Sequence, residues 1–248
     1  MIEVRDLKKS FGSLTILDDV NFRIEKGESV VIIGRSGGGK SVLLKHLIGL
    51  LTPDAGEVLI EGENVAAMNE RDLLRVRSKF GMLFQSAALF DSMTVAENVA
   101  FALRRNYRLQ EQEIAEQVAY VLELVDLPGI ETKRPSELSG GMKKRVGLAR
   151  AIVYHPEIVL YDEPTTGLDP IVSDSIDQLM LRVRDRLKVT SVVVTHDMRS
   201  ARRVGQRILM LHGKKIYAAG TPDEIFGSKD PIVRRFIDGV SDLKEDFF

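Results

Sequence analysis

The chain has 248 residues, of which 44% are hydrophobic and 29% are charged, enough for a globular protein with a sizeable core. Its formal net charge of −1 argues against a general affinity for nucleic acid, and the absence of cysteine excludes disulfides and thiolate metal sites. No apolar run approaches the ~20 residues of a membrane-spanning helix, so a partner is expected to mediate any membrane contact.

The first eighty residues are predicted to form strands and turns. Residues 20–25 alternate apolar and polar side chains, the pattern of a half-buried strand, and a turn follows at residues 26–27. The almost entirely apolar segment 29–33 is typical of a parallel strand covered on both faces. A turn over residues 53–56 precedes another alternating segment at residues 58–60.

The apolar period becomes helical after about residue 94. One stripe of an amphipathic helix recurs at spacings of four and three residues: Ile114, Val118, Leu122 and Val125. This pattern predicts a mainly helical insertion over roughly residues 88–140. Two basic clusters, at residues 143–145 and 202–203, are interpreted as solvated helix faces.

Strands and helices alternate again after the insertion. Buried strands are predicted at residues 158–161 and 192–194, with an amphipathic helix between them over residues 176–187. A hairpin is predicted to pair residues 208–211 with residues 216–219. The alternation indicates an α/β core of mostly parallel strands.

A phosphate-binding loop is the clearest motif. The segment GRSGGGKS fits G-x-x-x-x-G-K-[ST] and lies between the strand at 29–33 and a predicted helix over residues 41–51. Glycines let backbone N–H groups and the helix N-terminus face a phosphate group. Lys40 is expected to reach the β- and γ-phosphates of a nucleotide, and Ser41 to ligate Mg²⁺. The loop comprises Gly34, Arg35, Ser36, Gly37, Gly38, Gly39, Lys40 and Ser41.

An acidic pair follows the strand at 158–161. Asp162 fits the carboxylate that holds Mg²⁺ in P-loop ATPases. Glu163 is placed to accept a proton from an attacking water, or to orient that water. By itself, the pair could equally cap the next helix.

Four further features complete a family pattern. The segment LSGGM at 138–142 opens a predicted helix, and Gln85 follows an apolar strand. TTGLDP occupies residues 165–170, and His196 follows the strand at 192–194. With the phosphate loop and the acidic pair in this order, the chain resembles the ATP-binding cassette (ABC) ATPases over nearly its whole length.

The resemblance implies the fold and the domain organisation. The fold expected is an α/β P-loop NTPase core of mostly parallel strands, with an N-terminal antiparallel β subdomain and an inserted helical subdomain. A single ABC ATPase domain would span residues 1–240, with the helical subdomain at about 88–155. A C-terminal tail would occupy residues 241–248.

The segment at 138–142 gives the chain a second anion site. Ser139, Gly140 and Gly141 open a helix, whose N-terminus favours anions. The resemblance implies that they complete the phosphate-loop site of a second copy of the chain. Two ATP molecules would then lie between two chains arranged head to tail, and each chain alone would be an incomplete ATPase.

The resemblance also assigns roles to single residues. Gln85 would touch Mg²⁺ or water and face a membrane partner, although it could merely cap a strand. Asp169 would couple the two sites of the dimer, and His196 would sense the γ-phosphate. Phe11 would stack on adenine, although an aromatic there could instead belong to the core. Met142 replaces the glutamine that most often ends the family's LSGGQ segment, which points to a subfamily.

Three segments resemble one subfamily in particular. Residues 84–99, 138–142 and 230–239 are similar to the ATPases of Mla and Mce systems, which move phospholipids or other hydrophobic molecules between membranes of a bacterial envelope. The resemblance implies ATP hydrolysis coupled to transport, with ATP and Mg²⁺ as cofactors. The alternatives are the ATPase of a polar amino-acid importer and a non-transport ABC ATPase.

The same resemblance implies the partners and the location. The expected partners are a second copy of the chain, an integral membrane permease and a small STAS-like regulatory subunit. The expected location is the cytoplasmic face of the inner membrane, because the N-terminal segment MIEVRDLKKSFG lacks the apolar region of a signal peptide. The substrate is expected to be recognised by other subunits.

The tail ends in two adjacent phenylalanines. Exposed aromatics at a terminus would form an apolar patch, so Leu243, Phe247 and Phe248 are predicted to anchor the tail on another chain. The alternative is an ordinary frayed terminus.

Overall fold

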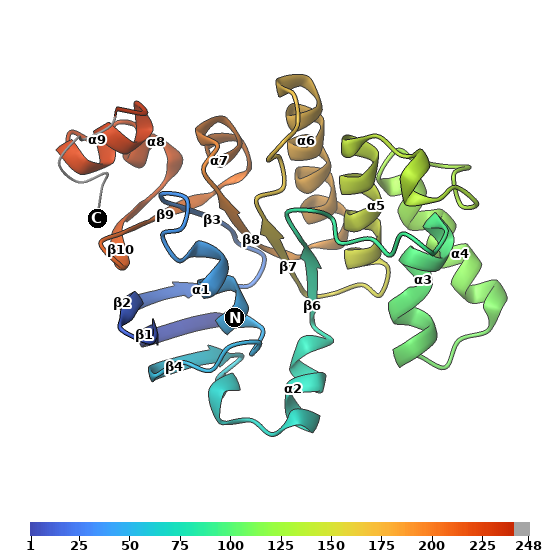
Figure 1. The fold of residues 1–248 in the computed structure, drawn as a ribbon, viewed down its shortest axis with the longest axis horizontal. Coiled ribbons are helices and arrows are strands. Elements are labelled where there is room, and N and C mark those ends of the chain that lie inside the picture. Colours follow the sequence, from blue (N-terminus) through green and yellow to red (C-terminus); the bar gives the residue numbers. More distant parts are fainter. Residues whose placement is uncertain (241–248) are drawn as a thin grey trace.

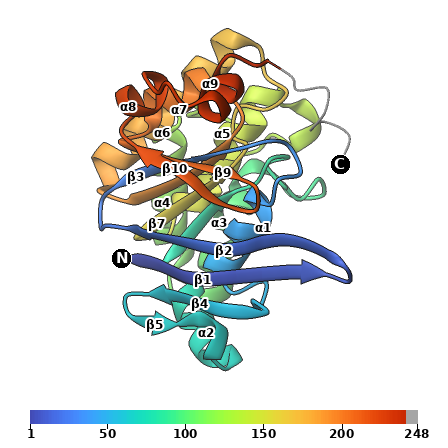
Figure 2. The same cartoon turned by 90° about the vertical axis from the view of Figure 1, so that its left-hand side faces the viewer.

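Two β-sheets form the centre of the part of the chain that the structure describes (Figure 1). The computed structural model describes residues 1–240. The tail at 241–248, and with it the anchor predicted for Leu243, Phe247 and Phe248, lies outside the described residues. Figure 2 shows the two sheets one above the other, with the N-terminal strands in the lower one.

The smaller sheet is antiparallel, in the order β2-β1-β4-β5. Its strands are β1 (Ile2–Phe11), β2 (Leu14–Ile24), β4 (Ala55–Ile60) and β5 (Glu63–Asn64). The period-two alternation predicted for residues 20–25 holds, because Val20 and Ile24 are fully buried while their neighbours face outward. This sheet is the predicted N-terminal antiparallel subdomain.

The larger sheet has the order β10-β9-β3-β8-β7-β6. Its strands are β3 (Ser29–Ile33), β6 (Phe80–Leu83), β7 (Ile158–Asp162), β8 (Thr190–Thr195), β9 (Arg207–His212) and β10 (Lys215–Gly220). Only β10 runs antiparallel, as the edge strand of the predicted hairpin. The prediction of a mostly parallel core is confirmed.

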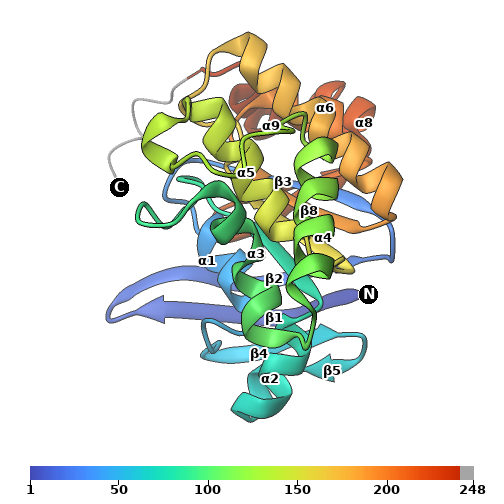
Figure 3. The same cartoon turned by 90° about the vertical axis from the view of Figure 1, so that its right-hand side faces the viewer.

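Helices cover the larger sheet and extend to one side of it. Between β6 and β7 lie α3 (Val95–Asn106), α4 (Glu111–Leu124) and α5 (Gly140–Ile152), which Figure 3 shows together at the front. The stripe predicted from Ile114 to Val125 is buried in the core shared with α5 and α6 (Pro170–Leu187). The treatment of about 88–155 as a separate subdomain stays a prediction.

Three short helices lie in the C-terminal part of the described chain, one after β8 and two after β10. They are α7 (Met198–Val204), α8 (Pro222–Phe226) and α9 (Pro231–Ile237). The P-loop helix is α1 (Lys40–Leu47), which lies between the two sheets. None of the helices within residues 1–240 is long and apolar enough to cross a membrane.

Two predictions of secondary structure were wrong, one missed helix and one helix end. A helix, α2 (Glu70–Arg77), lies where only strands and turns were predicted; it has few apolar side chains, and Val76 alone among its residues is buried. The helix predicted over 41–51 ends at Leu47, because Gly49 adopts a φ of +64°. The Gly49 N–H then bonds the carbonyl of His46, and the Leu50 N–H bonds that of Lys45, which is a Schellman ending.

Candidate nucleotide site

The candidate site lies where three neighbouring parallel strands end. In the register of the sheet, Ile33 of β3 pairs with Thr195 of β8, and Asp162 of β7 pairs with Val194 of β8. The phosphate loop and His196 each directly follow one of these strand ends, and the acidic pair comprises the last residue of β7, Asp162, and the residue after it. The carboxyl edge of a parallel sheet is a common place for ligands to bind, so the fold gathers these motifs there.

The phosphate loop needs its glycines at two close approaches. A Cβ on Gly34 would lie 2.6 Å from the main-chain oxygen of Leu211 in β9. Gly39 has a φ of +96°, and a Cβ there would lie 2.9 Å from a methyl group of Ile16 in β2. Lys40 closes the loop, since its Nζ donates to the carbonyl oxygens of Gly34 at 2.8 Å and Arg35 at 3.0 Å.

Lys40 and Glu163 form a buried ion pair at the centre of the site. The Lys40 Nζ lies 3.6 Å from Glu163 Oε1, and their side chains are 5% and 10% exposed. Burial lowers the pKa of Lys40, and the negative charges of Glu163 and Asp162 oppose that shift. The structure therefore brings together the two residues from which phosphate binding and attack by water are predicted.

A pair of oxygen atoms lies beside this ion pair. Ser41 Oγ donates to Asp162 Oδ1 at 2.9 Å, and burial is the main cause that raises the pKa of Asp162. Hydroxyl and carboxylate oxygens are the donors that Mg²⁺ prefers, and this cation would offset the desolvation of the carboxylate. Within residues 1–240 no three His, Asp or Glu side chains form a metal-binding group, so phosphate and water would supply the other ligands.

The carboxylate of Glu163 is held in a fixed direction. Its Oε2 lies 2.8 Å from Nδ1 of His196 and accepts a hydrogen bond of 3.1 Å from the Thr166 hydroxyl. The residue has a φ of +50°, and its N–H donates to the Val194 carbonyl at 2.9 Å. Gln85, the third residue with a predicted catalytic role, is exposed two positions after the end of β6.

The second predicted anion site and Asp169 lie side by side. Ser139 is the N-cap of α5, where its hydroxyl accepts from the Met142 N–H, and Asp169 caps α6. A Cβ on Gly141 would lie 2.6 Å from the side chain of Val172, so α5 and α6 touch at their N-termini. The P-loop instead packs against β2 and β9, on other elements of the chain.

Phe11, the predicted adenine contact, lies at the end of β1 in the β1–β2 hairpin. Its side chain is 49% exposed, and Lys9 Nζ lies 5.5 Å from the ring centroid. The alternative that Phe11 belongs to the core does not fit this exposure. Its stacking role stays a prediction, as do the roles of the other site residues.

The prediction that residues 143–145 form a solvated helix face is wrong for Lys144. Lys144 was interpreted as part of a solvated helix face, but it is 5% exposed and its Nζ donates to the main-chain oxygen of Glu163 at 3.1 Å. It shares a helical face with Leu148 and Ile152, both fully buried, at spacings of four residues. This periodicity is the sequence signal that marks Lys144 as inward-facing.

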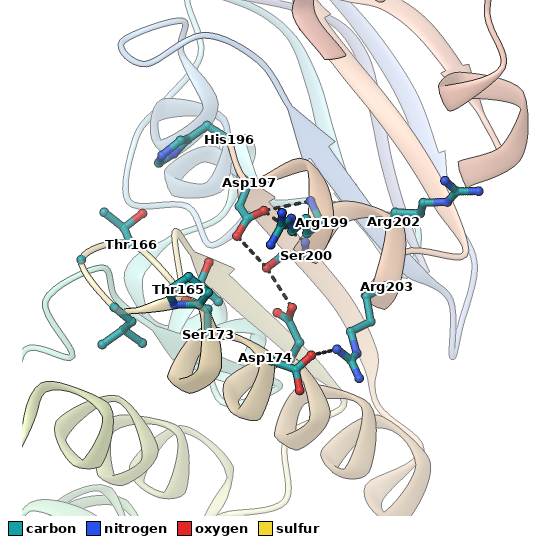
Figure 4. Close-up of a pocket in the computed structure, with 14 residues that line it drawn as sticks. Thr165, Thr166, Ser173, Asp174, His196, Asp197, Arg199, Ser200, Arg202 and Arg203 are labelled. Atoms are coloured by element: carbon teal, nitrogen blue, oxygen red, sulfur yellow. Dashed lines mark hydrogen bonds and ion pairs between the residues drawn. The ribbon is translucent and has the colours of Figure 1, made fainter. Parts of the chain in front are cut away.

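A cavity of about 720 Å³ adjoins the site between α6 and α7 (Figure 4). Two residues of its lining are bonded to each other: Ser200 of α7 donates to Asp177 Oδ2 of α6 at 2.9 Å, and both side chains are buried. Burial, assisted by the negative charge of Asp197, raises the pKa of Asp177 to about 6. Arg203 pairs with Asp174 nearby, which makes a second link between the two helices.

Comparisons with known proteins agree with this geometry. The ABC transporter family model matches residues 17–166. The probable ribonucleotide transport ATP-binding protein mkl of Mycobacterium leprae is 44% identical over 96% of this chain and 69% of its own length. The intermembrane phospholipid transport system ATP-binding protein MlaF of Haemophilus influenzae is 40% identical over 98% of this chain and 92% of its own length.

A solved structure is also similar over most of the chain. It is the dimeric, post-hydrolysis state of the ATP-binding cassette MJ0796 bound to ADP and Pi. The TM-score is 0.82 at 33% sequence identity, and the match covers 90% of this chain and 99% of the other. The likeness therefore extends well beyond the residues of the family model.

Proposed function

The chain belongs to the ABC transporter family, and on that premise we propose that it is the MgATP-hydrolysing subunit of a transport system for phospholipid or another hydrophobic substrate. The proposed ATPase activity rests on the position of the Glu163 carboxylate, which lies between Lys40 and His196 and next to the Ser41–Asp162 pair. The direct test is whether ATP turnover disappears when this carboxylate becomes an amide.

Each residue of the site has a part in this proposal. The N–H groups of the loop at 34–41 and the Lys40 ammonium bind the phosphates, and the Glu163 carboxylate accepts a proton from the attacking water or orients it. His196 fixes the direction of that carboxylate through Nδ1. Ser41 and Asp162, with Gln85, would hold Mg²⁺, which neutralises phosphate charge when bound.

A second copy of the chain is proposed to complete each site. Support comes from the position of Ser139 at the α5 N-terminus, on elements other than those around the P-loop, and from the dimeric form of the similar MJ0796 cassette. In a head-to-tail pair, the helix N-terminus of one chain would face the γ-phosphate held by the other. Asp169, beside Ser139, would couple the two sites.

The substrate class rests on the Mla-like segments at 84–99, 138–142 and 230–239 and on the similarity to a phospholipid transport ATPase. The mycobacterial relative is described as a probable ribonucleotide transport protein, so polar cargo is a competing outcome. The test is to purify the chain with its membrane partner and to measure ATPase stimulation. Stimulation by phospholipid vesicles supports the proposal; stimulation by ribonucleotides or polar amino acids alone contradicts it.

The remaining partners and the location follow from the same proposal. We place the chain at the cytoplasmic face of the inner membrane, bound to an integral membrane permease. A small STAS-like subunit is proposed as a regulatory partner, on the resemblance to Mla-type ATPases. Co-purification of a multi-span membrane protein and of a second, small soluble subunit with the tagged chain is the measurement that tests both.

A further inference from the structure

Lys144 connects helix α5 to the main chain of Glu163. Its Nζ donates to the Glu163 carbonyl oxygen at 3.1 Å, and the lysine is 5% exposed. The residue lies five positions after Ser139, the N-cap of the same helix. The helix that presents Ser139 at its end thus also reaches into the site of its own chain.

Burial of the Lys144 ammonium is electrostatically unfavourable, and the packing of α5 does not require a charged side chain at this position. Desolvation is the main cause that lowers the pKa of Lys144, and the negative charges of Asp162 and Glu163 oppose the shift. An apolar side chain of similar length would fill the same space without desolvating a charge. Packing therefore does not explain why this residue is a lysine, and its hydrogen bond to the Glu163 carbonyl is the feature that an apolar side chain could not supply.

The bond partner is a residue in an unfavourable backbone conformation. Glu163 has a φ of +50°, a backbone conformation that residues other than glycine seldom adopt. Such a conformation persists only where surrounding contacts stabilise it. Its N–H is held by the Val194 carbonyl at 2.9 Å. Its carbonyl is held by Lys144 at 3.1 Å and by the Thr166 N–H at 3.3 Å. Rotation of this peptide would turn the carboxylate away from its present direction.

A second cation of α5 is used in the same way. Arg150 donates from its two terminal nitrogens to the carbonyl oxygens of Ala87 and Ala88, each at 2.7 Å. These two residues have φ values of +60° and +49°, and they follow Gln85 in the loop after β6. Lys144 therefore belongs to a pattern in which α5 holds left-handed backbone in the loops after β6 and β7.

We propose that Lys144 is a positioning residue of the ATPase, which holds the Glu163 peptide and so aims its carboxylate at the reacting water. The proposal rests on the proposed catalytic role of Glu163. If Ser139 faces the nucleotide of the second copy, Lys144 also ties the two sites together. A shift of α5 on nucleotide contact at its N-terminus would then move the Glu163 peptide of its own chain.

The test compares side chains that do and do not donate a hydrogen bond at position 144. Lys144→Met keeps an apolar stem and removes the donor, whereas Lys144→Gln keeps a donor. We expect Lys144→Met to lower kcat at least tenfold, with ATP affinity by titration within threefold of the parent and no large fall in melting temperature. Lys144→Gln is expected to recover at least a third of parental turnover. Lys229→Met, at an exposed lysine outside the site, is the control and should match the parent.

Three results would overturn the proposal. They are turnover of Lys144→Met within threefold of the parent, loss of ATP affinity in proportion to turnover, and failure of the glutamine to restore activity. Lys144→Leu replaces the methionine variant if that protein does not fold. Glu163→Gln is measured in parallel: if it retains turnover, the proposed catalytic role has failed, whereas a loss there with no effect at Lys144 removes this inference alone.

Discussion

Nδ1 of His196 lies 2.8 Å from Oε2 of Glu163, a contact between the ends of two neighbouring strands. A carboxylate can only accept a hydrogen bond, so this contact places the imidazole proton on Nδ1. The imidazole is 50% exposed, which leaves its Nε2 for another partner. In the neutral ring this atom can only accept a hydrogen bond, so a phosphate oxygen would bind there to the doubly protonated ring. The pair thus fixes, relative to each other, the carboxylate proposed as catalytic and the imidazole predicted to sense the γ-phosphate.

Lys40→Ala is expected to lower ATP affinity and turnover together. The substitution removes the positive charge predicted at the β- and γ-phosphates, and it leaves the buried Glu163 carboxylate without its ion-pair partner. Titration with a fluorescent ATP analogue and steady-state phosphate release measure the two effects. Parental affinity in this variant would show that Lys40 does not contact the nucleotide.

Composite sites predict that two inactive variants can complement each other. Ser139→Arg should block the second anion site and Lys40→Ala the phosphate loop, yet a mixed head-to-tail dimer has one site with neither defect. We expect the mixture to exceed the turnover of either variant alone. The control is Lys40→Ala mixed with Glu163→Gln, in which every mixed site retains a defect. Recovery in the first mixture but not in the control supports the composite arrangement. Only this positive result is decisive, because coupling of the two sites through Asp169 would hide the recovery.

Asp177 is expected to make stability depend on pH. Its pKa is raised from 3.8 to about 6, so its protonated form stabilises the fold at low pH, and this contribution is lost as the pH rises from about 4 to about 6. Asp177→Asn stays neutral and can still accept from Ser200. Relative to the parent, the variant should gain up to ~3 kcal/mol in the free energy of unfolding at pH 8.

Urea denaturation of the parent and of Asp177→Asn at pH 5 and pH 8 measures this gain. The predicted gain is clearly larger at pH 8 than at pH 5. A variant that is no more stable at pH 8 than the parent would show that the carboxylate is not desolvated as the structure implies.

Deletion of residues 241–248 tests the predicted tail anchor. Burial of Leu243, Phe247 and Phe248 on another chain would contribute a few kcal/mol, most of which is offset by ordering the segment. The truncated protein is expected to assemble about tenfold to thirtyfold more weakly with its complex, with ATP affinity unchanged. Parental assembly across a concentration series would leave the tail without this role.

Local motifs made much of the site predictable from sequence. The phosphate loop and the acidic pair are each defined within a few residues, and the apolar strands before them give their place in the fold. The closeness of Glu163 to His196 was not predictable in this way. It depends on β7 and β8 being neighbours in the sheet, and strands that follow each other in sequence need not pair.

The errors also have local physical causes. Helix α2 has little apolar surface, so its sequence lacks a clear helical stripe. It is held instead by polar contacts, namely the Asn69 cap and the Arg77 bonds to the carbonyls of Ile48 and Gly49. Lys144 lies in a run of basic residues, a composition that predicts exposure to solvent. Its position on the helix, four residues before the buried Leu148, instead predicts burial. At this position the helical period, and not the basic composition, agrees with the burial of the side chain.

The turnover of Glu163→Gln tests the central claim most directly. Steady-state phosphate release should fall at least ~100-fold while ATP affinity is kept, because the water loses its base or orienting carboxylate. The ATP-bound dimer should also live longer in gel filtration, since one negative charge near the γ-phosphate is removed. Turnover within threefold of the parent, at every protein concentration tried, would contradict the assignment of Glu163 as the catalytic carboxylate.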